Sequence, residues 1–264
     1  MSKEPSSCPS RAPSMLFVPE SGRPQALLLM LHGCTQNPAD FARGTRMNDW
    51  ARRGNFAVLY PEQTRSANPK LCWNWFSKEH QQAGAGEPAS LMELVRSTQQ
   101  QLEISPDRIF LAGLSAGACM SAILAARYPA VFAGVGLHSG VPLGAASSVV
   151  GALLAMRGLS KWTQSRSWNA PTLIFQGDRD KVVSLKNADR LAIQAGLGPN
   201  AQEEELWDNG RRVRRSRSAD ARVERWLVEG LGHAWSGGSL EGSWTDPEGP
   251  DASAQIVRFF GIGQ

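Results

Sequence analysis

The chain has 264 residues, a length typical of one α/β domain or of two small domains. Hydrophobic residues make up 42% and charged residues 20%, which excludes a disordered chain, and the longest apolar run is far below the roughly 20 residues that a membrane-spanning helix needs. The formal net charge of +4 is mildly basic. Since no aromatic residue or nucleic-acid motif accompanies the arginines within residues 211–217, we expect a solvated segment there and no nucleic-acid partner.

Residues 1–14 are rich in serine and proline, and we expect a flexible tail there, ahead of one folded domain over residues 15–264. The tail has no apolar stretch, so no secretory signal peptide is visible, and the default expectation is a cytoplasmic protein. The four cysteines, at positions 8, 34, 72 and 119, form no CxxC pair and no zinc-type pattern, so we expect no metal site. Cys34 and Cys72 would meet only if their loops converge, which their positions leave open.

Apolar runs alternate with helical patterns along the rest of the chain. In chain order we expect strands at Met15–Val18, Ala26–Leu31, Phe56–Tyr60, Arg108–Ala112, Val131–Leu137 and Pro171–Phe175. Helices are expected at Asp40–Arg53, Leu91–Leu102, Ala116–Tyr128, Leu185–Ala195 and Asp251–Phe260. A long loop over 61–88, a partly helical, cap-like insertion over 141–169, and a hairpin over Leu206–Val228 with the arginine run in or near its turn complete the chain.

This alternation predicts an α/β fold. Strands that alternate with helices form βαβ units with right-handed crossovers, and these build a mostly parallel central sheet with helices on both faces. Ligands of such sheets bind beyond the carboxyl ends of the strands. The motifs that follow predicted strands are therefore the candidates for a functional site.

A GxSxG motif spans residues 113–117, where a predicted strand meets a predicted helix. In this context the tight turn strains the backbone of the serine, and the glycines remove side chains that would otherwise collide. The positive end of the helix favours an anion that develops beside the serine. We therefore expect Ser115 to be a nucleophile. The alternative is a glycine-rich turn in which Ser115 only caps the helix.

A serine nucleophile needs a base, and in this fold class the order along the chain is serine, acid, histidine. Only His233 follows Ser115 at a distance that leaves room for an acid on an intervening strand. Asp178 and Asp180 both lie on the loop after the predicted strand Pro171–Phe175, where such an acid belongs. Position alone barely separates these two aspartates.

The same chemistry needs two N–H donors for an oxyanion. One is expected from Ala116, directly after the nucleophile, and the other from the loop after the strand Ala26–Leu31. In that loop the N–H of Cys34 is our first choice and that of Thr35 the second. We expect His32 to shape the loop.

Six sequence blocks together resemble one family. In order they read LHGCTQNP, VLYPEQ, CWNWF, FLAGLSAGACM, QGDRDKVV and GLGHAWSGG, and they resemble the esterase family of poly(3-hydroxybutyrate) depolymerases. That family is related to the feruloyl and acetylxylan esterases of carbohydrate esterase family one. The resemblance covers about residues 15 to 260 and implies an α/β-hydrolase fold with one catalytic domain.

Carried over residue by residue, the resemblance implies that Ser115 is the nucleophile, Asp180 the acid and His233 the base. It also implies that Cys34 and Cys72 form a disulfide between the oxyanion loop and the CWNWF loop. Two features depart from the family. Residues 140–145 read GVPLGA and lack the cysteine of the family's GLPYGC-like segment, and many relatives carry signal peptides, which makes a secreted or periplasmic protein the alternative location.

The resulting hypothesis is a serine esterase that acts on hydroxyalkanoate oligomers or small soluble esters without a metal or cofactor. A feruloyl or acetylxylan esterase, an acyltransferase and a non-catalytic binding protein on the same fold are the alternatives. The expected partner is a small or oligomeric ester, with no nucleic acid and no membrane, and the oligomeric state is left open. Trp235, two residues from His233, and Trp73 and Trp75 are candidate substrate contacts.

Overall fold

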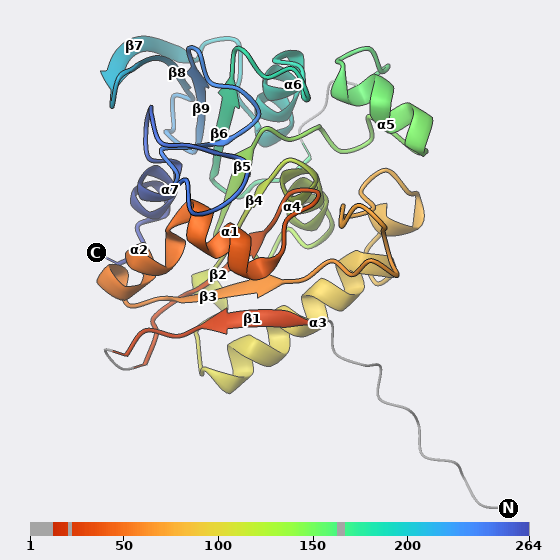
Figure 1. Cartoon of the computed structure of the whole chain (residues 1–264), viewed down its shortest axis with the longest axis vertical. Coiled ribbons are helices and arrows are strands. Elements are labelled where there is room, and N and C mark those ends of the chain that lie inside the picture. The colour runs from red at the N-terminus through yellow and green to blue at the C-terminus, as the bar shows by residue number, and fades with distance from the viewer. Residues whose placement is uncertain (1–12, 21–22, 163–166, 264) are drawn as a thin grey trace, which may run out of the picture.

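The computed structural model describes residues 13–20, 23–162 and 167–263. Within them nine strands form one sheet, in the order β1-β3-β2-β4-β5-β6-β9-β8-β7, beside a small pair of strands, β10 and β11 (Figure 1). The strands are β1 (Ser14–Phe17), β2 (Leu27–Leu31), β3 (Ala57–Pro61), β4 (Ile109–Leu114), β5 (Gly134–His138), β6 (Thr172–Gly177), β7 (Gln202–Asp208), β8 (Arg211–Arg217), β9 (Val223–Val228), β10 (Trp235–Ser236) and β11 (Thr245–Asp246). The α-helices are α1 (Pro38–Thr45), α2 (Met47–Gly54), α3 (Gly86–Gln101), α4 (Ala116–Arg127), α5 (Val149–Met156), α6 (Lys186–Ala195) and α7 (Ala252–Phe260). Most of the expected tail, residues 1–12, lies outside the described residues.

The centre of the sheet is parallel and its two edges are antiparallel. The strands from β3 through β2, β4, β5 and β6 to β9 pair in parallel. At one edge β1 runs antiparallel to β3, and at the other β8 and β7 continue the sheet antiparallel to β9. The predicted mostly parallel α/β sheet is confirmed.

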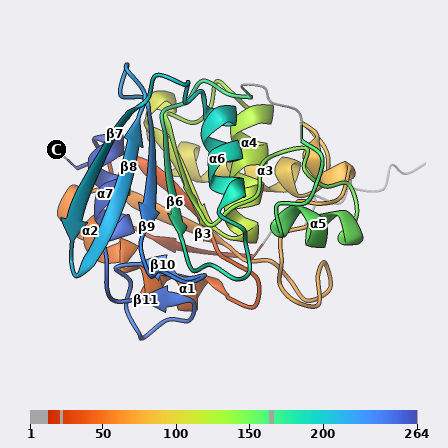
Figure 2. The same cartoon turned by 90° about the horizontal axis from the view of Figure 1, so that it is seen from above.

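Helices cover both faces of this sheet, as Figure 2 shows for α3, α4 and α6 on one side and α2 and α7 on the other. The division follows from the two-residue period of a strand. In β2, Leu27, Leu29 and Leu31 join the core cluster with α3, α4 and α6, while Leu28 and Met30 join the cluster with α1, α2 and α7. A strand buried on both faces must be apolar throughout, which explains the continuous run in the sequence.

The expected helix over 40–53 is two helices. The backbone of Arg46 has φ 52°, in the left-handed region, and it separates α1 from α2. Its guanidinium donates hydrogen bonds to the carbonyl of Gly237 and to the carboxylate of Asp251. These contacts join Arg46 to residues far away in the sequence. The spacing of apolar residues therefore could not predict the break between the two helices.

The arginine run, expected in or near the turn of a hairpin, lies directly after the turn and forms strand β8. The turn is Asn209-Gly210, whose residues both have positive φ, as tight hairpin turns require. The arginines alternate across the sheet and pair with acidic residues of the neighbouring strands: Arg215 with Glu204 and Arg217 with Glu224. The segment is therefore the centre of a three-stranded antiparallel extension and not a simple hairpin.

The long loop and the insertion carry their own local structure. Within 61–88 a short 3-10 helix forms at Glu79–Gln81, and α3 begins at Gly86, earlier than expected. The insertion over 141–169 contains α5, which buries only its two alanines, Ala152 and Ala155. Residues 163–166 of the insertion lie outside the described residues. In the described parts of the chain no helix has the length and apolar character needed to cross a bilayer.

Helix α4 lies very close to the backbone of β2 because two glycines of the GxSxG motif allow it. A Cβ atom on Gly117 would lie 2.0 Å from the carbonyl oxygen of Leu31. A Cβ atom on Gly113 would lie 2.5 Å from the carbonyl carbon of Gly117. Any larger residue at either position must push α4 away from the sheet.

We expect Gly117→Ala to destabilise the fold by about 3 kcal/mol or more, because the added methyl group meets backbone atoms that cannot rotate away. Urea unfolding followed by circular dichroism measures this. Gly198→Ala is the matched control, since its Cβ would have no atom within 4 Å, and its free energy of unfolding should change by less than about 0.5 kcal/mol. Equal unfolding midpoints for the two variants would contradict the packing argument.

Candidate active site

Ser115 occupies a strained turn between β4 and α4. Its backbone has φ 56° and ψ −118°, a combination that non-glycine residues rarely adopt. The turn is held from both sides: the N–H of Ser115 donates to the carbonyl of His138 at 2.8 Å, and its carbonyl accepts from Cys119 at 3.0 Å. The half-buried side chain lines a cavity of about 420 Å³ at the carboxyl ends of the strands.

His233 lines the same cavity and binds Asp180. The loop after β9 carries His233, and the loop after β6 carries Asp180. The carboxylate Oδ2 of Asp180 accepts a hydrogen bond from Nδ1 of His233 at 2.7 Å, and the side chain of Asp180 is fully buried. With the proton on Nδ1, the neutral ring has Nε2 as its basic nitrogen.

Other donors saturate the Asp180 carboxylate. Its Oδ1 accepts from the N–H groups of Val182 and Val183, each at 2.8 Å, and its Oδ2 also accepts from Nε2 of Gln176 at 3.0 Å. Burial acts to raise the pKa of Asp180, but the hydrogen bond and charge of His233 and the two N–H groups outweigh it, so the pKa lies below its ordinary value. The acid is therefore held as a carboxylate.

The structure separates the two aspartates that sequence position left open. Asp178 does not contact His233; its carboxylate accepts from the N–H of Gly230 at 2.7 Å and stabilises the turn after β9. The motif that the resemblance identified, with Asp180 as the acid, agrees with this geometry.

The loop between β2 and α1, residues 32–37, is the oxyanion loop expected from the sequence. One of its backbone N–H groups has no hydrogen-bond acceptor among the described residues. In this loop the N–H of Gly33 donates to Oε1 of Gln36, that of Thr35 to the carbonyl of Lys70 at 2.8 Å, and that of Gln36 to the carbonyl of Gly33. No acceptor in the described part of the chain receives the N–H of Cys34, which lines the cavity. Ala116 is the first residue of α4, where an N–H has no acceptor within the helix. The geometry therefore favours Cys34 over Thr35.

Cys34 and Cys72 form a disulfide, as the resemblance implied. The bond joins the oxyanion loop to the loop that precedes α3, beside the hydrogen bond from Thr35 to Lys70. Cys119 is free and buried, and burial raises the pKa of its thiol to about 12. Cys8 lies outside the described residues.

The other two buried histidines support the site from behind. Nε2 of His32 accepts from the N–H of Gln63, and its Nδ1 is 2.8 Å from the carbonyl of Gly33, so the ring fixes the oxyanion loop as expected. Nε2 of His138 accepts from the N–H of Ser236 at 3.1 Å. Burial, reinforced by the nearby His233, lowers the pKa of His138 to about 3, so this ring is neutral.

Of the three tryptophans expected at the cavity, only Trp75 lines it. Trp73 is buried, and its Nε1 donates to the carbonyl of His32 at 3.1 Å. Trp235 is buried in the core on the other side of the sheet, where its ring stacks on His138 and its Nε1 donates to Ser253. The expectation for Trp73 and Trp235 was wrong, because a buried indole whose N–H has a partner packs well in the protein core.

The structure adds an apolar wall and Trp244, which the sequence did not indicate. The large apolar side chains of the cavity are Trp75, Phe76, Leu114, Val149, Leu153, Met156 and Val182, together with Trp244. Trp244 lies edge-on to the ring of His233, and its Nε1 donates to Oγ1 of Thr35 at 3.1 Å. It belongs to an irregular loop between β10 and β11, which has no periodic pattern to reveal its location.

A polar clamp holds the Trp244 loop against the oxyanion loop. Nε2 of Gln36 donates to the carbonyl of Ser243 at 2.9 Å, while the N–H of Ser243 donates to the carboxylate of Asp40 at 3.0 Å. Among the described residues, no group of three or more histidine, cysteine or acidic side chains is arranged to hold a metal ion. The groups at the cavity suit nucleophilic and general-base chemistry.

Comparisons with known proteins agree with the resemblance. The sequence model of a family described as "Esterase PHB depolymerase" matches residues 16–197. Poly(3-hydroxyalkanoate) depolymerase C of Paucimonas lemoignei is 30% identical over 78% of this chain and 54% of its own length, and acetylxylan esterase A of Emericella nidulans is 30% identical over 52% and 44%. The chain thus spans about half the length of the curated relatives that it matches.

Solved structures show the same fold at low sequence identity. The acetyl xylan esterase from Aspergillus awamori superimposes with a TM-score of 0.76 at 18% identity and covers 96% of this chain and 95% of its own. The Bacillus cereus carboxylesterase has a TM-score of 0.57 at 13% identity and 96% coverage of both chains. These neighbours identify the fold as that of α/β-hydrolases.

The disulfide yields a stability prediction. Closing a loop of 38 residues should stabilise the fold by about 2–4 kcal/mol, so a Cys34→Ser/Cys72→Ser variant should melt several degrees lower. Cys8→Ser is the control, since it leaves the bond intact. Alkylation of the denatured, unreduced chain should label two thiols; labelling of all four would disprove the bond.

Proposed function

Because this chain belongs to the esterase PHB depolymerase family, we propose that it is a serine esterase that hydrolyses carboxylic esters through an acyl-enzyme on Ser115. One observation carries the proposal. Asp180 holds His233 by a 2.7 Å hydrogen bond at the wall of the cavity that Ser115 also lines. A buried acid, an oriented imidazole and a strained serine are the three parts that activate a hydroxyl group.

In the first half-reaction Nε2 of His233 takes the proton of the Ser115 hydroxyl while its oxygen attacks the ester carbonyl carbon. The carbonyl oxygen becomes an oxyanion, which the N–H groups of Cys34 and Ala116 stabilise. When the tetrahedral intermediate collapses, the bond to the alcohol breaks and His233 gives its proton to the leaving oxygen. Asp180 stabilises the imidazolium that exists between the two proton transfers.

In the second half-reaction water replaces the alcohol. His233 takes a proton from water, the resulting hydroxide attacks the acyl carbon, and the same two N–H groups hold the second oxyanion. The proton then returns to Ser115, which releases a carboxylic acid and the free enzyme. An added alcohol that enters in place of water would yield a new ester, which is the acyl-transfer alternative.

For the substrate we propose an ester with an apolar acyl chain, such as a hydroxyalkanoate oligomer or a small soluble ester. The cavity wall is mostly aliphatic and aromatic, with Asn68 and Lys70 among its few polar residues apart from the reacting groups. A sugar would need many hydrogen-bond partners to replace its water, and this wall offers few. A panel of p-nitrophenyl esters, hydroxybutyrate oligomers, methyl ferulate and acetylated xylan compares the alternatives directly.

We also propose that residues 15–264 act as one catalytic domain in which the insertion forms a partial cap. Helix α5 supplies Val149, Leu153 and Met156 to the cavity wall, although it lies outside the sheet layers (Figure 1). The cap restricts the entrance from one side.

Ser115→Ala should abolish labelling by a fluorophosphonate probe and remove nearly all hydrolysis of p-nitrophenyl butyrate. A residual rate of roughly 10³–10⁴ over water is compatible with the oxyanion donors and binding alone. The exposed serine of α3 supplies the control: Ser90→Ala should keep full labelling and activity. Hydrolysis by Ser115→Ala within tenfold of the parent rate would refute the proposed nucleophile.

Asp180→Asn should lower kcat by about 10⁴, because the amide no longer holds the reactive tautomer of His233 or stabilises its charge. Asp178→Asn should lower kcat less than about tenfold, since an asparagine oxygen still accepts from Gly230. Steady-state kinetics on folded protein compares them. A larger loss in Asp178→Asn would overturn the assignment of the acid.

A further inference from the structure

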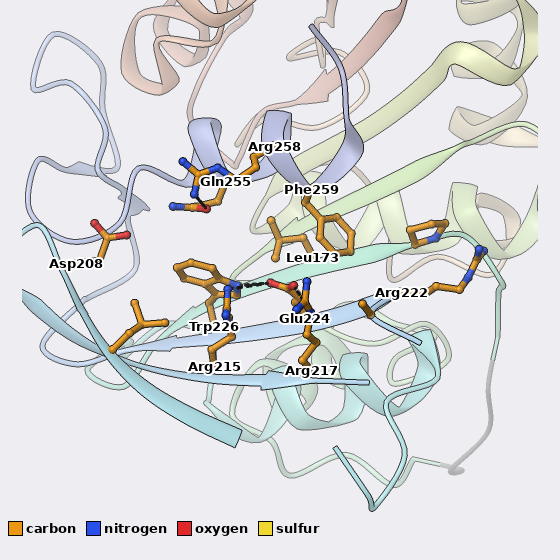
Figure 3. A pocket seen from close by; sticks show the side chains of 13 residues that line it. Leu173, Asp208, Arg215, Arg217, Arg222, Glu224, Trp226, Gln255, Arg258 and Phe259 are labelled. Atoms are coloured by element: carbon orange, nitrogen blue, oxygen red, sulfur yellow. Dashed lines mark hydrogen bonds and ion pairs between the residues drawn. The ribbon is translucent and has the colours of Figure 1, made fainter. Parts of the chain in front are cut away.

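A second cavity, of about 510 Å³, lies near the amino ends of β6 and β9, and Figure 3 shows its lining residues. Ser115, Asp180 and His233 follow the carboxyl ends of β4, β6 and β9, whereas this cavity is lined by Leu173 and Glu224 near the amino ends of β6 and β9. Helix α7 forms its other wall. The two cavities share no lining residue within the described chain.

Four arginines from three elements meet in this cavity. Arg215 and Arg217 come from β8, Arg222 from the turn between β8 and β9, and Arg258 from α7. Only two acidic residues join them in the lining. The strand arginines are part of the run that the sequence shows, Arg222 lies on the turn that follows the run, and the fold adds Arg258 from distant α7.

Two of these guanidiniums, those of Arg222 and Arg258, form no salt bridge with a described carboxylate, although the charge of Arg222 helps to lower the pKa of nearby Asp220. Arg222 donates to the carbonyl of Asn169 at 2.8 Å, and Arg258 donates to the side-chain oxygen of Gln255 at 3.3 Å. Both acceptors are neutral, and no carboxylate in the described residues pairs with either arginine. Ion pairing within the sheet therefore does not explain their presence.

Buried Glu224 binds Arg217 and lies 3.9 Å from the guanidinium of Arg215. Its carboxylate accepts from Nε1 of Trp226 at 3.0 Å and from Nε of Arg217 at 2.8 Å, as Figure 3 shows for the tryptophan. An arginine bound through Nε keeps its two terminal nitrogens for another acceptor. Arg215 lies over the ring of Trp226, 5.5 Å from its centroid, and is paired with Glu204. Arg215 and Arg217 are thus held by partners within the chain, whereas Arg222 and Arg258 are exposed.

The floor of the cavity is apolar. Its base is formed by Trp226 and Leu173, which are 4% and 1% exposed, with Phe259 opposite on α7 (Figure 3). The apolar surface open to the cavity comes from half-buried side chains: Pro171, Leu206 and Phe259. A small inorganic anion would leave this surface in contact with water, whereas a hydrocarbon chain or ring would cover it. Binding cavities typically combine such an apolar surface with a few convergent polar groups.

We propose that this cavity is a second ligand site, which binds an amphipathic anion. Its carboxylate or phosphate head group would bind the guanidiniums, above all Arg222 and Arg258. Its apolar body would lie against Leu206 and Phe259, which line the cavity. Guanidinium groups pair with both head groups through two parallel hydrogen bonds. Binding here requires no catalysis at Ser115.

Isothermal titration calorimetry on the full chain tests the proposal with four probes: octanoate, octyl phosphate, octanol and inorganic phosphate. The two amphipathic anions should bind at least tenfold more tightly than octanol or inorganic phosphate, and the tighter of the two identifies the head group. Equal affinity for octanol would refute the role of the arginines, and equal affinity for inorganic phosphate would refute the role of the apolar floor.

A matched pair of double variants locates the binding. Arg222→Gln/Arg258→Gln should weaken the better probe at least tenfold. Arg96→Gln/Arg214→Gln removes the same charge from exposed arginines that do not line this cavity, and should change affinity less than twofold. An equal loss in both variants, or no loss in the first, would overturn the proposal. Esterase activity serves as a separate readout, so failure of the site and failure of the proposed function are distinguishable.

Discussion

The close approach of α4 to the backbone of β2 is the constraint on which the candidate active site depends. Gly117 allows it, because any Cβ atom there would overlap the carbonyl of Leu31. The chain leaves β2 at that carbonyl and enters the oxyanion loop, so the same contact places Gly33 next to Ser115: a Cβ atom added to Gly33 would lie 3.6 Å from the Cβ atom of Ser115. In the proposed mechanism the N–H groups of Cys34 and Ala116 act on one oxyanion, and this backbone packing is what brings their two segments together.

Irregular segments around the cavity gain their rigidity from bonds between them. The Cys34–Cys72 disulfide and the hydrogen bond from Thr35 to Lys70 join the oxyanion loop to the loop before α3. Gln36 and Asp40 join it to Ser243, next to the tryptophan that covers His233. None of these loops has a regular backbone ladder to fix it, so cross-links replace the ladder. Oxyanion catalysis needs donors that do not reorganise during the reaction, and this arrangement meets that need.

The sequence predicted the parallel core and the GxSxG turn because both depend on local patterns: apolar runs, helical periodicity and two glycines. His233 was predicted as the base by elimination and Asp180 as the acid by the motif resemblance, since position alone left Asp178 equivalent; the structure shows the hydrogen bond between His233 and Asp180. Which tryptophans line the cavity could not be predicted from the sequence. Trp235 and Trp244 are both near His233 in the sequence or in space, yet only contacts with Ser253 and Thr35 determine which is buried and which reaches the cavity. Such long-range contacts leave no periodic signal in a single sequence.

The surroundings of the arginine run also depend on long-range contacts that a single sequence does not show. Alternation in β8 sends Arg215 and Arg217 to the α7 face and Arg214 to the other, which the sequence could have indicated once the Asn209-Gly210 turn was recognised. It could not indicate that Arg222 and Arg258 join them. The groups available to a negative charge therefore differ between the carboxyl ends and the amino ends of the strands. At the carboxyl ends, uncharged N–H groups suit the proposed oxyanion, which exists only briefly and must be released. At the amino ends, full guanidinium charges beside apolar side chains suit the proposed amphipathic anion, which stays bound.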